Sequence, residues 1–172
     1  MIASGIDALI YIPYDSAGAQ TVLQTCKDAG VKVINIDNVI TEDDYELVDG
    51  IIASDNTQLG YLSGQWVAEN HPDGANVLVV HLQTAESCII NVDGFWKGIK
   101  DNTENAEAFK EVQVVEGEGS TETSFNVVSD ALQAHDDIDV IYCINDTSAL
   151  GAVQAVEDAG KTGQIDYSWK RW

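Results

Sequence analysis

Short apolar runs alternate along this chain with longer segments in which apolar residues recur every three or four positions. The apolar runs read "DALIYIP", "VKVINID", "DGIIASD", "ANVLVVHLQ", "KEVQVVEGEG" and "IDVIYCIND". The helical patterns read "AGAQTVLQTCKDAG", "NTQLGYLSGQWVAENH", "CIINVDGFWKGIKDN" and "TETSFNVVSDALQAH". Strands without a polar face are typical of parallel sheets that are covered on both sides. The alternation therefore predicts an α/β fold, a doubly wound parallel sheet with helices on both faces.

Polar residues follow the predicted strands. Ligands of open parallel sheets bind beyond the carboxyl ends of the strands, so these residues form the candidate site. They are amides, carboxylates and hydroxyls with almost no cation, and they lie at 13–15, 37–38, 54–55, 83–84, 117–120 and 145–146.

The charge of the chain narrows the range of partners. Its 172 residues include 29 Asp and Glu but only 8 Lys and Arg, which gives a formal net charge of -21. Such a surface repels phosphate backbones and anionic lipids, so we expect no nucleic-acid partner and no insertion into a membrane. No apolar run approaches the roughly 20 residues of a membrane span. The residues after Met1 have neither a basic region nor a cleavage site, so we expect no export signal within this sequence.

Motifs for catalysis, metals and cofactors are missing. The three cysteines have no CxxC spacing and look like small buried side chains; they are Cys26, Cys88 and Cys143. The histidines have no metal-binding spacing either; they are His71, His81 and His135. The glycine-containing segment "EGEGSTETSF" lacks the signatures of a phosphate-binding loop, and its glutamates would repel phosphate. We therefore predict a protein that is no enzyme and has no catalytic residue, metal site or cofactor.

Five segments together resemble the periplasmic sugar-binding proteins of ABC importers, of the ribose-binding type, whose ligand-binding fold is shared by LacI-type repressors. The segments are "GIDALIYIPYDSAG", "AGVKVINIDN", "IIASDNTQLGYLSGQWVAE", "VDGFWKGI" and "IYCINDTSALGAVQAVEDAGK". The resemblance runs from about Ser4 to Lys161 with the motif order kept. It implies two α/β lobes that close on a sugar, with "ASDN" marking the crossing between them. Residues 1–54 would then be a partial first lobe and residues 55–172 most of the second.

The resemblance also implies which residues bind the ligand. Asn145 takes the position of an asparagine that binds sugar hydroxyls, and Asp146 is expected to cap the following helix. In the first lobe, Asp37 takes the position of an aspartate that accepts two hydroxyl hydrogen bonds. Asn38 and Asn91 stand where relatives carry arginine. Without these two guanidinium groups a sugar acid is disfavoured, and a small neutral sugar is the expected ligand.

Relatives have further strands and helices before the position of Met1 and beyond Lys161. The resemblance therefore predicts a fragment of a longer protein, with weak or no sugar binding. Open sheet edges predict pairing with a second copy, hence a homo-oligomer. The parent protein would be periplasmic or extracellular and would deliver sugar to the membrane permease of an importer. The effector-sensing domain of a LacI-type transcription regulator is the alternative, although the strong negative charge favours the importer class.

Overall fold

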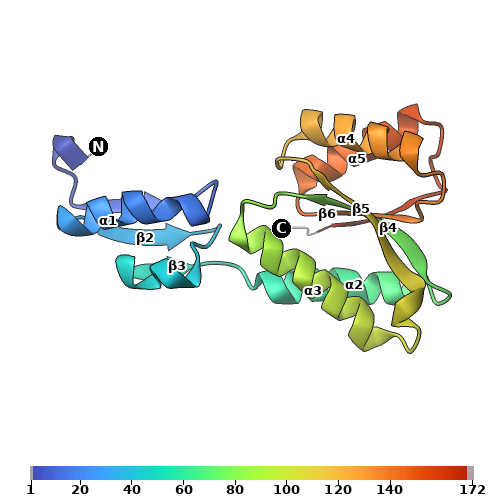
Figure 1. Cartoon of the computed structure of the whole chain (residues 1–172), viewed down its shortest axis with the longest axis horizontal. Helices are drawn as coiled ribbons and strands as arrows, with labels where there is room; N and C mark the ends of the chain where they lie inside the picture. Colours follow the sequence, from blue (N-terminus) through green and yellow to red (C-terminus); the bar gives the residue numbers. More distant parts are fainter. Residues whose placement is uncertain (1, 170–172) are drawn as a thin grey trace. The chain divides into compact units, whose positions relative to one another are not determined.

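The computed structural model describes residues 2–169, which form two compact units. The first unit comprises Met1–Asn56 and Gln83–Ile89, and the second comprises Thr57–Leu82 and Ile90–Trp172. Each unit has a parallel sheet of its own (Figure 1). The parallel α/β fold predicted from the apolar runs is therefore confirmed. The segment Gln83–Ile89 lies inside the range that the sequence assigns to the second lobe, yet it packs with the first unit.

The first unit contains a three-stranded sheet in the order β1-β2-β3. Its elements are β1 (Ala8–Tyr11), α1 (Gln20–Asp28), β2 (Lys32–Ile36) and β3 (Gly50–Ile52), with short 3-10 helices at Ile2–Ser4, Ala17–Ala19 and Glu42–Leu47. Helix α1 covers one face of the sheet with Leu23 and Cys26, which pack in a cluster with Val33 of β2 and Ile40. The helix ends before Gly30, whose φ of 72° is the left-handed conformation typical of a helix C-terminus.

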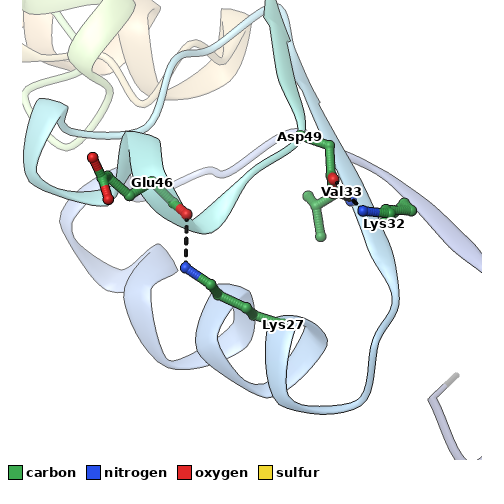
Figure 2. Close-up of polar contacts among 5 residues, drawn as sticks. All are labelled: Lys27, Lys32, Val33, Glu46 and Asp49. Atoms are coloured by element: carbon green, nitrogen blue, oxygen red, sulfur yellow. Dashed lines mark hydrogen bonds and ion pairs between the residues drawn. The ribbon is translucent and has the colours of Figure 1, made fainter.

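Figure 2 shows how the amino-terminal end of β2 is joined to its neighbours. The Asp49 carboxylate accepts the backbone N–H of Val33 at 2.9 Å and the Lys32 ammonium at 2.7 Å. Lys27 near the end of α1 donates to the Glu46 carbonyl at 2.9 Å. The hydrogen bond from Lys32 is the main reason that the pKa of Asp49 is lowered. The carboxylate thus extends the pairing of β2 and β3 by one step beyond the strands.

The second unit contains a four-stranded parallel sheet in the order β5-β4-β6-β7. Its elements are α2 (Asn56–Asn70), β4 (Ala75–His81), α3 (Glu86–Asn102), a 3-10 helix (Ala106–Ala108), β5 (Phe109–Glu116), α4 (Thr121–Ala134), β6 (Val140–Cys143), α5 (Asp146–Asp158) and β7 (Asp166–Trp169). Helices α4 and α5 cover one face, and α2 and α3 lie on the other (Figure 1). Both faces of this sheet are therefore buried, which explains why β4 and β6 are apolar almost throughout.

Glycines allow α2 and α3 to approach each other very closely. A Cβ atom at Gly60 would lie 1.9 Å from the carbonyl oxygen of Asn91, and one at Gly64 would lie 1.9 Å from that of Phe95. Gly98 of α3 similarly faces the Tyr61 carbonyl at 2.1 Å. No side chain larger than hydrogen fits at these distances. The two backbones are therefore in direct contact, and the spacing of four residues from Gly60 to Gly64 is the sequence signal of this contact.

Candidate ligand-binding site

Asp37 lies directly after β2 in the first unit and has a left-handed backbone, with φ of 63°. This conformation is uncommon for residues other than glycine and persists only where the surroundings hold it. Here the Asp37 N–H donates to the Ile52 carbonyl at 3.0 Å, and its own carbonyl accepts from the Ser87 hydroxyl at 3.1 Å. The side chain is exposed, and within residues 2–169 its carboxylate has no hydrogen-bond partner. A fixed backbone thus presents a free carboxylate at the carboxyl end of the sheet.

Asn38 is buried beside it, and its side-chain amide is occupied. The amide nitrogen donates to the Pro13 carbonyl at 2.7 Å and to the Ser16 hydroxyl at 3.3 Å. The amide oxygen accepts the N–H of Ser87 at 3.1 Å. Both amide hydrogens are used, so this side chain joins the segments around it rather than facing outward.

Ser16 and Ser87 extend this framework. The Ser16 hydroxyl donates to the Val39 carbonyl at 2.7 Å and accepts the N–H of Glu86 at 3.0 Å. The Ser87 hydroxyl accepts the N–H of Val39 at 3.0 Å. Buried polar groups need such partners, and here each serine connects stretches far apart in sequence. The start of α3 is thereby fixed against the loop that carries Asp37.

Asn35, in β2, completes this set of hydrogen bonds through its contact with Asn38. It is fully buried, and its amide nitrogen donates to the carbonyls of Tyr11 at 3.1 Å and Asn38 at 2.9 Å. Its oxygen accepts the N–H of Ile40 at 3.2 Å. Asn35, Ser16 and Ser87 are not among the site residues predicted from the sequence. The one available signal was an asparagine inside the otherwise apolar run "VKVINID".

In the second unit, Asn145 lies beyond β6 and caps helix α5. Its side-chain oxygen accepts the N–H of Ser148 at 2.8 Å, and its backbone is extended, with φ of -158° and ψ of 172°. The prediction that Asp146 caps this helix is wrong, because Asp146 is already the first helical residue. The Asp146 carboxylate instead accepts the indole N–H of Trp169 at 2.9 Å. Its charge still lies at the helix amino terminus, where the helix dipole favours it.

A tight turn after β5 faces Asn145. Glu118 and Gly119 both have left-handed backbones, with φ of 53° and 64°. The Thr147 hydroxyl donates to the Gly119 carbonyl at 2.6 Å, which ties this turn to the start of α5. A Cβ atom at Gly119 would lie 3.1 Å from the amide nitrogen of Asn145. The turn therefore leaves room for the side-chain NH2 group of Asn145. The side-chain oxygen of Asn145 is already used to cap α5.

Asn91 lies inside the second unit, in helix α3, and only 2% of its surface is exposed. Its side-chain oxygen accepts a hydrogen bond from the hydroxyl of Tyr142 on β6. The Tyr142 ring stacks on Phe95, with ring centroids 3.9 Å apart and planes inclined by 11°. The oxygen of Asn91 thus satisfies a buried hydroxyl in the core between α3 and the sheet.

His81 ends strand β4 and is buried. Its Nδ1 atom accepts the N–H of Leu82 at 2.7 Å, so the neutral ring carries its proton on Nε2. Burial is the main cause that lowers the pKa of His81, and the charges of Glu116 and Asp93 oppose the shift in part. His81 was not among the predicted site residues.

Each unit thus has its own polar group of residues at the carboxyl end of its sheet. Asp37 and Asn38 belong to the first unit, and Asn145 belongs to the second. Asn91 also belongs to the second unit, where it is bonded to Tyr142 of β6. Among residues 2–169, no group of three His, Cys, Asp or Glu side chains is placed to hold a metal ion. No helix in the same part of the chain is long and apolar enough to cross a membrane.

Parallel sheets with helices packed on them and polar residues at their carboxyl ends define an α/β fold of the kind that binds ligands at this edge of the sheet. Comparison with known proteins identifies the family. Residues 1–167 match the family described as "Periplasmic binding protein domain", and the chain belongs to this family. The resemblance stated from the sequence motifs is thereby confirmed.

Several characterised proteins are similar to nearly the whole chain. A D-ribose/D-allose-binding protein of Pseudomonas aeruginosa is 33% identical over 96% of this chain and 51% of its own length. The galactofuranose-binding protein YtfQ of Escherichia coli is 29% identical over 96% of this chain and 54% of its own length. A crystal structure from Mycobacterium smegmatis in complex with beta-D-fucofuranose superimposes with a TM-score of 0.87, at 29% identity, over 96% of this chain and 55% of that one.

These relatives are named as binding proteins, in agreement with the prediction that the chain is no enzyme. The chain spans about half the length of the curated relatives that it matches.

Proposed function

We propose that this chain is part of the monosaccharide-binding component of an ABC-type importer, with a small neutral sugar as ligand. The observation that carries the proposal is Asp37, an exposed carboxylate without a hydrogen-bond partner in residues 2–169, held at the end of a parallel sheet by both of its backbone groups. Relatives named for D-ribose, D-allose, galactofuranose and D-xylose support a monosaccharide as ligand.

The chemistry of these residues suits sugar hydroxyls. A carboxylate only accepts hydrogen bonds, so Asp37 pairs with hydroxyls that donate. The NH2 group of Asn145 donates to a hydroxyl oxygen. Neither group needs a charged ligand, and the predicted site residues include no cation that would select a sugar acid. Asn38 and Asn91 are occupied by protein partners, so we assign them to positioning: Asn38 holds the Asp37 loop, and Asn91 holds Tyr142 of β6.

Binding by this chain alone should be weak. Micromolar affinity corresponds to about -8 kcal/mol. A hydrogen bond to a charged group contributes about 1.5 to 3 kcal/mol, and a neutral one about 1 kcal/mol. Asp37 or Asn145 alone contributes no more than this, which corresponds to a dissociation constant in the millimolar range or weaker.

The complete protein would act in the periplasm or outside the cell and deliver its sugar to a membrane permease. A relative named D-xylose-binding periplasmic protein, from Escherichia coli, is 29% identical to this chain. A homo-oligomer remains part of the proposal, because the sheet edges need cover. The acidic charge of -21 disfavours the alternative role in a DNA-bound regulator.

Saturation-transfer NMR, which detects millimolar binding, tests the proposal with D-ribose, D-allose and D-xylose at about 10 mM each. We expect a signal for at least one sugar, weakened severalfold by Asp37→Ala. The matched control is Asp43→Ala, which removes another exposed aspartate of the first unit, in the 3-10 helix Glu42–Leu47. No signal for any sugar, or equal signals for Asp37→Ala and the unaltered chain, would contradict the proposal.

A further inference from the structure

Three consecutive residues after β2 are all bonded to one residue, Ser87. The Ser87 hydroxyl donates to the Asp37 carbonyl at 3.1 Å and accepts the Val39 N–H at 3.0 Å. The Ser87 N–H donates to the side-chain oxygen of Asn38 at 3.1 Å. Ser87 is buried and lies 50 residues beyond Asp37 in the sequence. The turn that carries Asp37 therefore depends on one distant residue for three of its contacts.

The two backbone groups of Asp37 are held by different parts of the first unit. Its N–H donates to the Ile52 carbonyl at 3.0 Å and so continues the pairing of β2 with β3. Its carbonyl accepts from the Ser87 hydroxyl. For a residue with a side chain, the left-handed conformation of Asp37, with φ of 63°, is less favourable than the extended or right-handed one. The sheet fixes only the N–H side of Asp37, so the bond from Ser87 selects the left-handed conformation.

The same contacts complete the amino terminus of helix α3. The first N–H groups of a helix have no partner within the helix. In α3 the N–H of Glu86 donates to the Ser16 hydroxyl at 3.0 Å, and the N–H of Ser87 donates to Asn38. Both partners belong to the first unit, as does the segment Gln83–Ile89. The turn after β2 and the start of α3 thus hold each other in place.

The backbone conformation of Asp37 sets the direction of its side chain. A change of φ from 63° to a negative value would rotate the Cβ atom relative to the neighbouring peptide planes. The exposed carboxylate would then leave the sheet in another direction. Ser87 is buried, so any effect of its hydroxyl on a ligand is transmitted through this change at Asp37.

We infer that Ser87 is a positioning residue for the ligand: it holds Asp37 in the left-handed conformation and thereby directs the carboxylate. The inference rests on the proposed function, in which Asp37 meets a sugar hydroxyl. It goes beyond that function because it assigns the direction of this carboxylate to a hydroxyl in the first turn of α3.

NMR of the ligand-free chain tests the conformational step. At positive φ the N–H and Hα hydrogens of a residue are closer together than in extended or right-handed backbone, so Asp37 should give a strong NOE between them. Ser87→Ala should weaken this NOE, and Ser87→Thr, which keeps the hydroxyl, should restore it. The matched control is Ser16→Ala. Ser16 is also a buried serine whose hydroxyl has two backbone partners, and neither of them is Asp37, so this variant should keep the strong NOE.

Saturation-transfer NMR with the same three sugars tests the ligand step. Ser87→Ala should raise the dissociation constant about fivefold, the effect of one neutral hydrogen bond, and by no more than Asp37→Ala does. If Ser87 acts only through Asp37, adding Ser87→Ala to Asp37→Ala should cause no further loss of binding. Ser87→Cys, whose thiol is a weak donor of similar size, is the second variant if Ser87→Ala does not fold. It should change the NOE and the binding in the same direction.

Four results would overturn the inference. They are an unchanged NOE at residue 37 in Ser87→Ala, an equal loss of this NOE in Ser16→Ala, no recovery in Ser87→Thr, and a further loss of sugar binding when Ser87→Ala is added to Asp37→Ala. The proposed function fails separately. An unaltered chain without any sugar signal would refute the sugar as ligand, whereas the NOE would still decide whether Ser87 holds Asp37.

Discussion

The two units achieve stability by different means. The second unit has an apolar sheet buried on both faces and two helices in backbone contact at Gly60 and Gly64. The first unit has a smaller sheet covered on one face, and a connected set of buried side-chain hydrogen bonds around Asn35 and Asn38. Apolar burial scales with the covered area, whereas buried polar groups contribute only while every partner is present. We therefore expect the second unit to be the more stable, and the first to depend on individual polar residues.

The largest effect is expected from Gly64→Ala in the second unit. The added Cβ atom would lie 1.9 Å from the Phe95 carbonyl oxygen, so α2 and α3 must separate. Overpacking of this kind costs about 1 to 3 kcal/mol, and a clash with backbone lies at the upper end or beyond. Urea unfolding followed by circular dichroism measures the change. The control is Glu69→Ala on the exposed side of α2, which should change the free energy of unfolding by less than about 0.5 kcal/mol.

Asn35→Ala should have the next largest effect, confined to the first unit. It leaves the carbonyl of Asn38 and the N–H of Ile40, both buried, without their partners. Each unsatisfied buried group costs about 1 to 3 kcal/mol. Native-state hydrogen exchange should show faster exchange throughout β1 to β3 and unchanged protection in β4 and β6. Equal loss of protection in both sheets would refute the separation of the units into independently stabilised bodies.

Acid should weaken the second unit through His81. Its pKa is lowered in the folded state, so between that pKa and the unfolded value near 6.5 the unfolded chain binds more protons. Stability is therefore full above about pH 6.5 and decreases as the pH falls. Thermal unfolding from about pH 7.5 to 5.5 measures this slope. His81→Gln, which cannot titrate, should show a smaller decrease over the same range; an identical slope in both proteins would rule out His81 as its source.

The smallest effect is expected from Lys32→Gln, which breaks the ion pair with Asp49 shown in Figure 2. Both side chains are exposed to solvent, where ion pairs are screened and add little to stability. The thermal midpoint should stay within error of that of the unaltered chain. A clear drop would show that the first unit also depends on surface charges.

The parallel sheets could be predicted because their strands are continuous apolar runs such as "ANVLVVHLQ", and this pattern depends on local sequence alone. Strand β7 could not, since Asp166 and Ser168 interrupt its apolar residues. The cap of α5 was misassigned because asparagine and aspartate are equally good caps, and the choice depends on where the helix begins. Asn35, Asn38 and Asn91 have partners 24, 25 and 51 residues away, which no local pattern reveals.

We propose that Asp37 in the first unit and Asn145 in the second each present a polar group to a sugar. Amide chemical-shift mapping tests it most directly, with ¹⁵N-labelled chain titrated with D-ribose or D-allose. The claim predicts concentration-dependent shifts for the backbone N–H of Asp37, which is bonded to Ile52, and for the side-chain NH2 of Asn145, while the α2 residues around Gly64 stay unchanged. Shifts that saturate elsewhere, with the Asp37 and Asn145 signals unmoved, would contradict it.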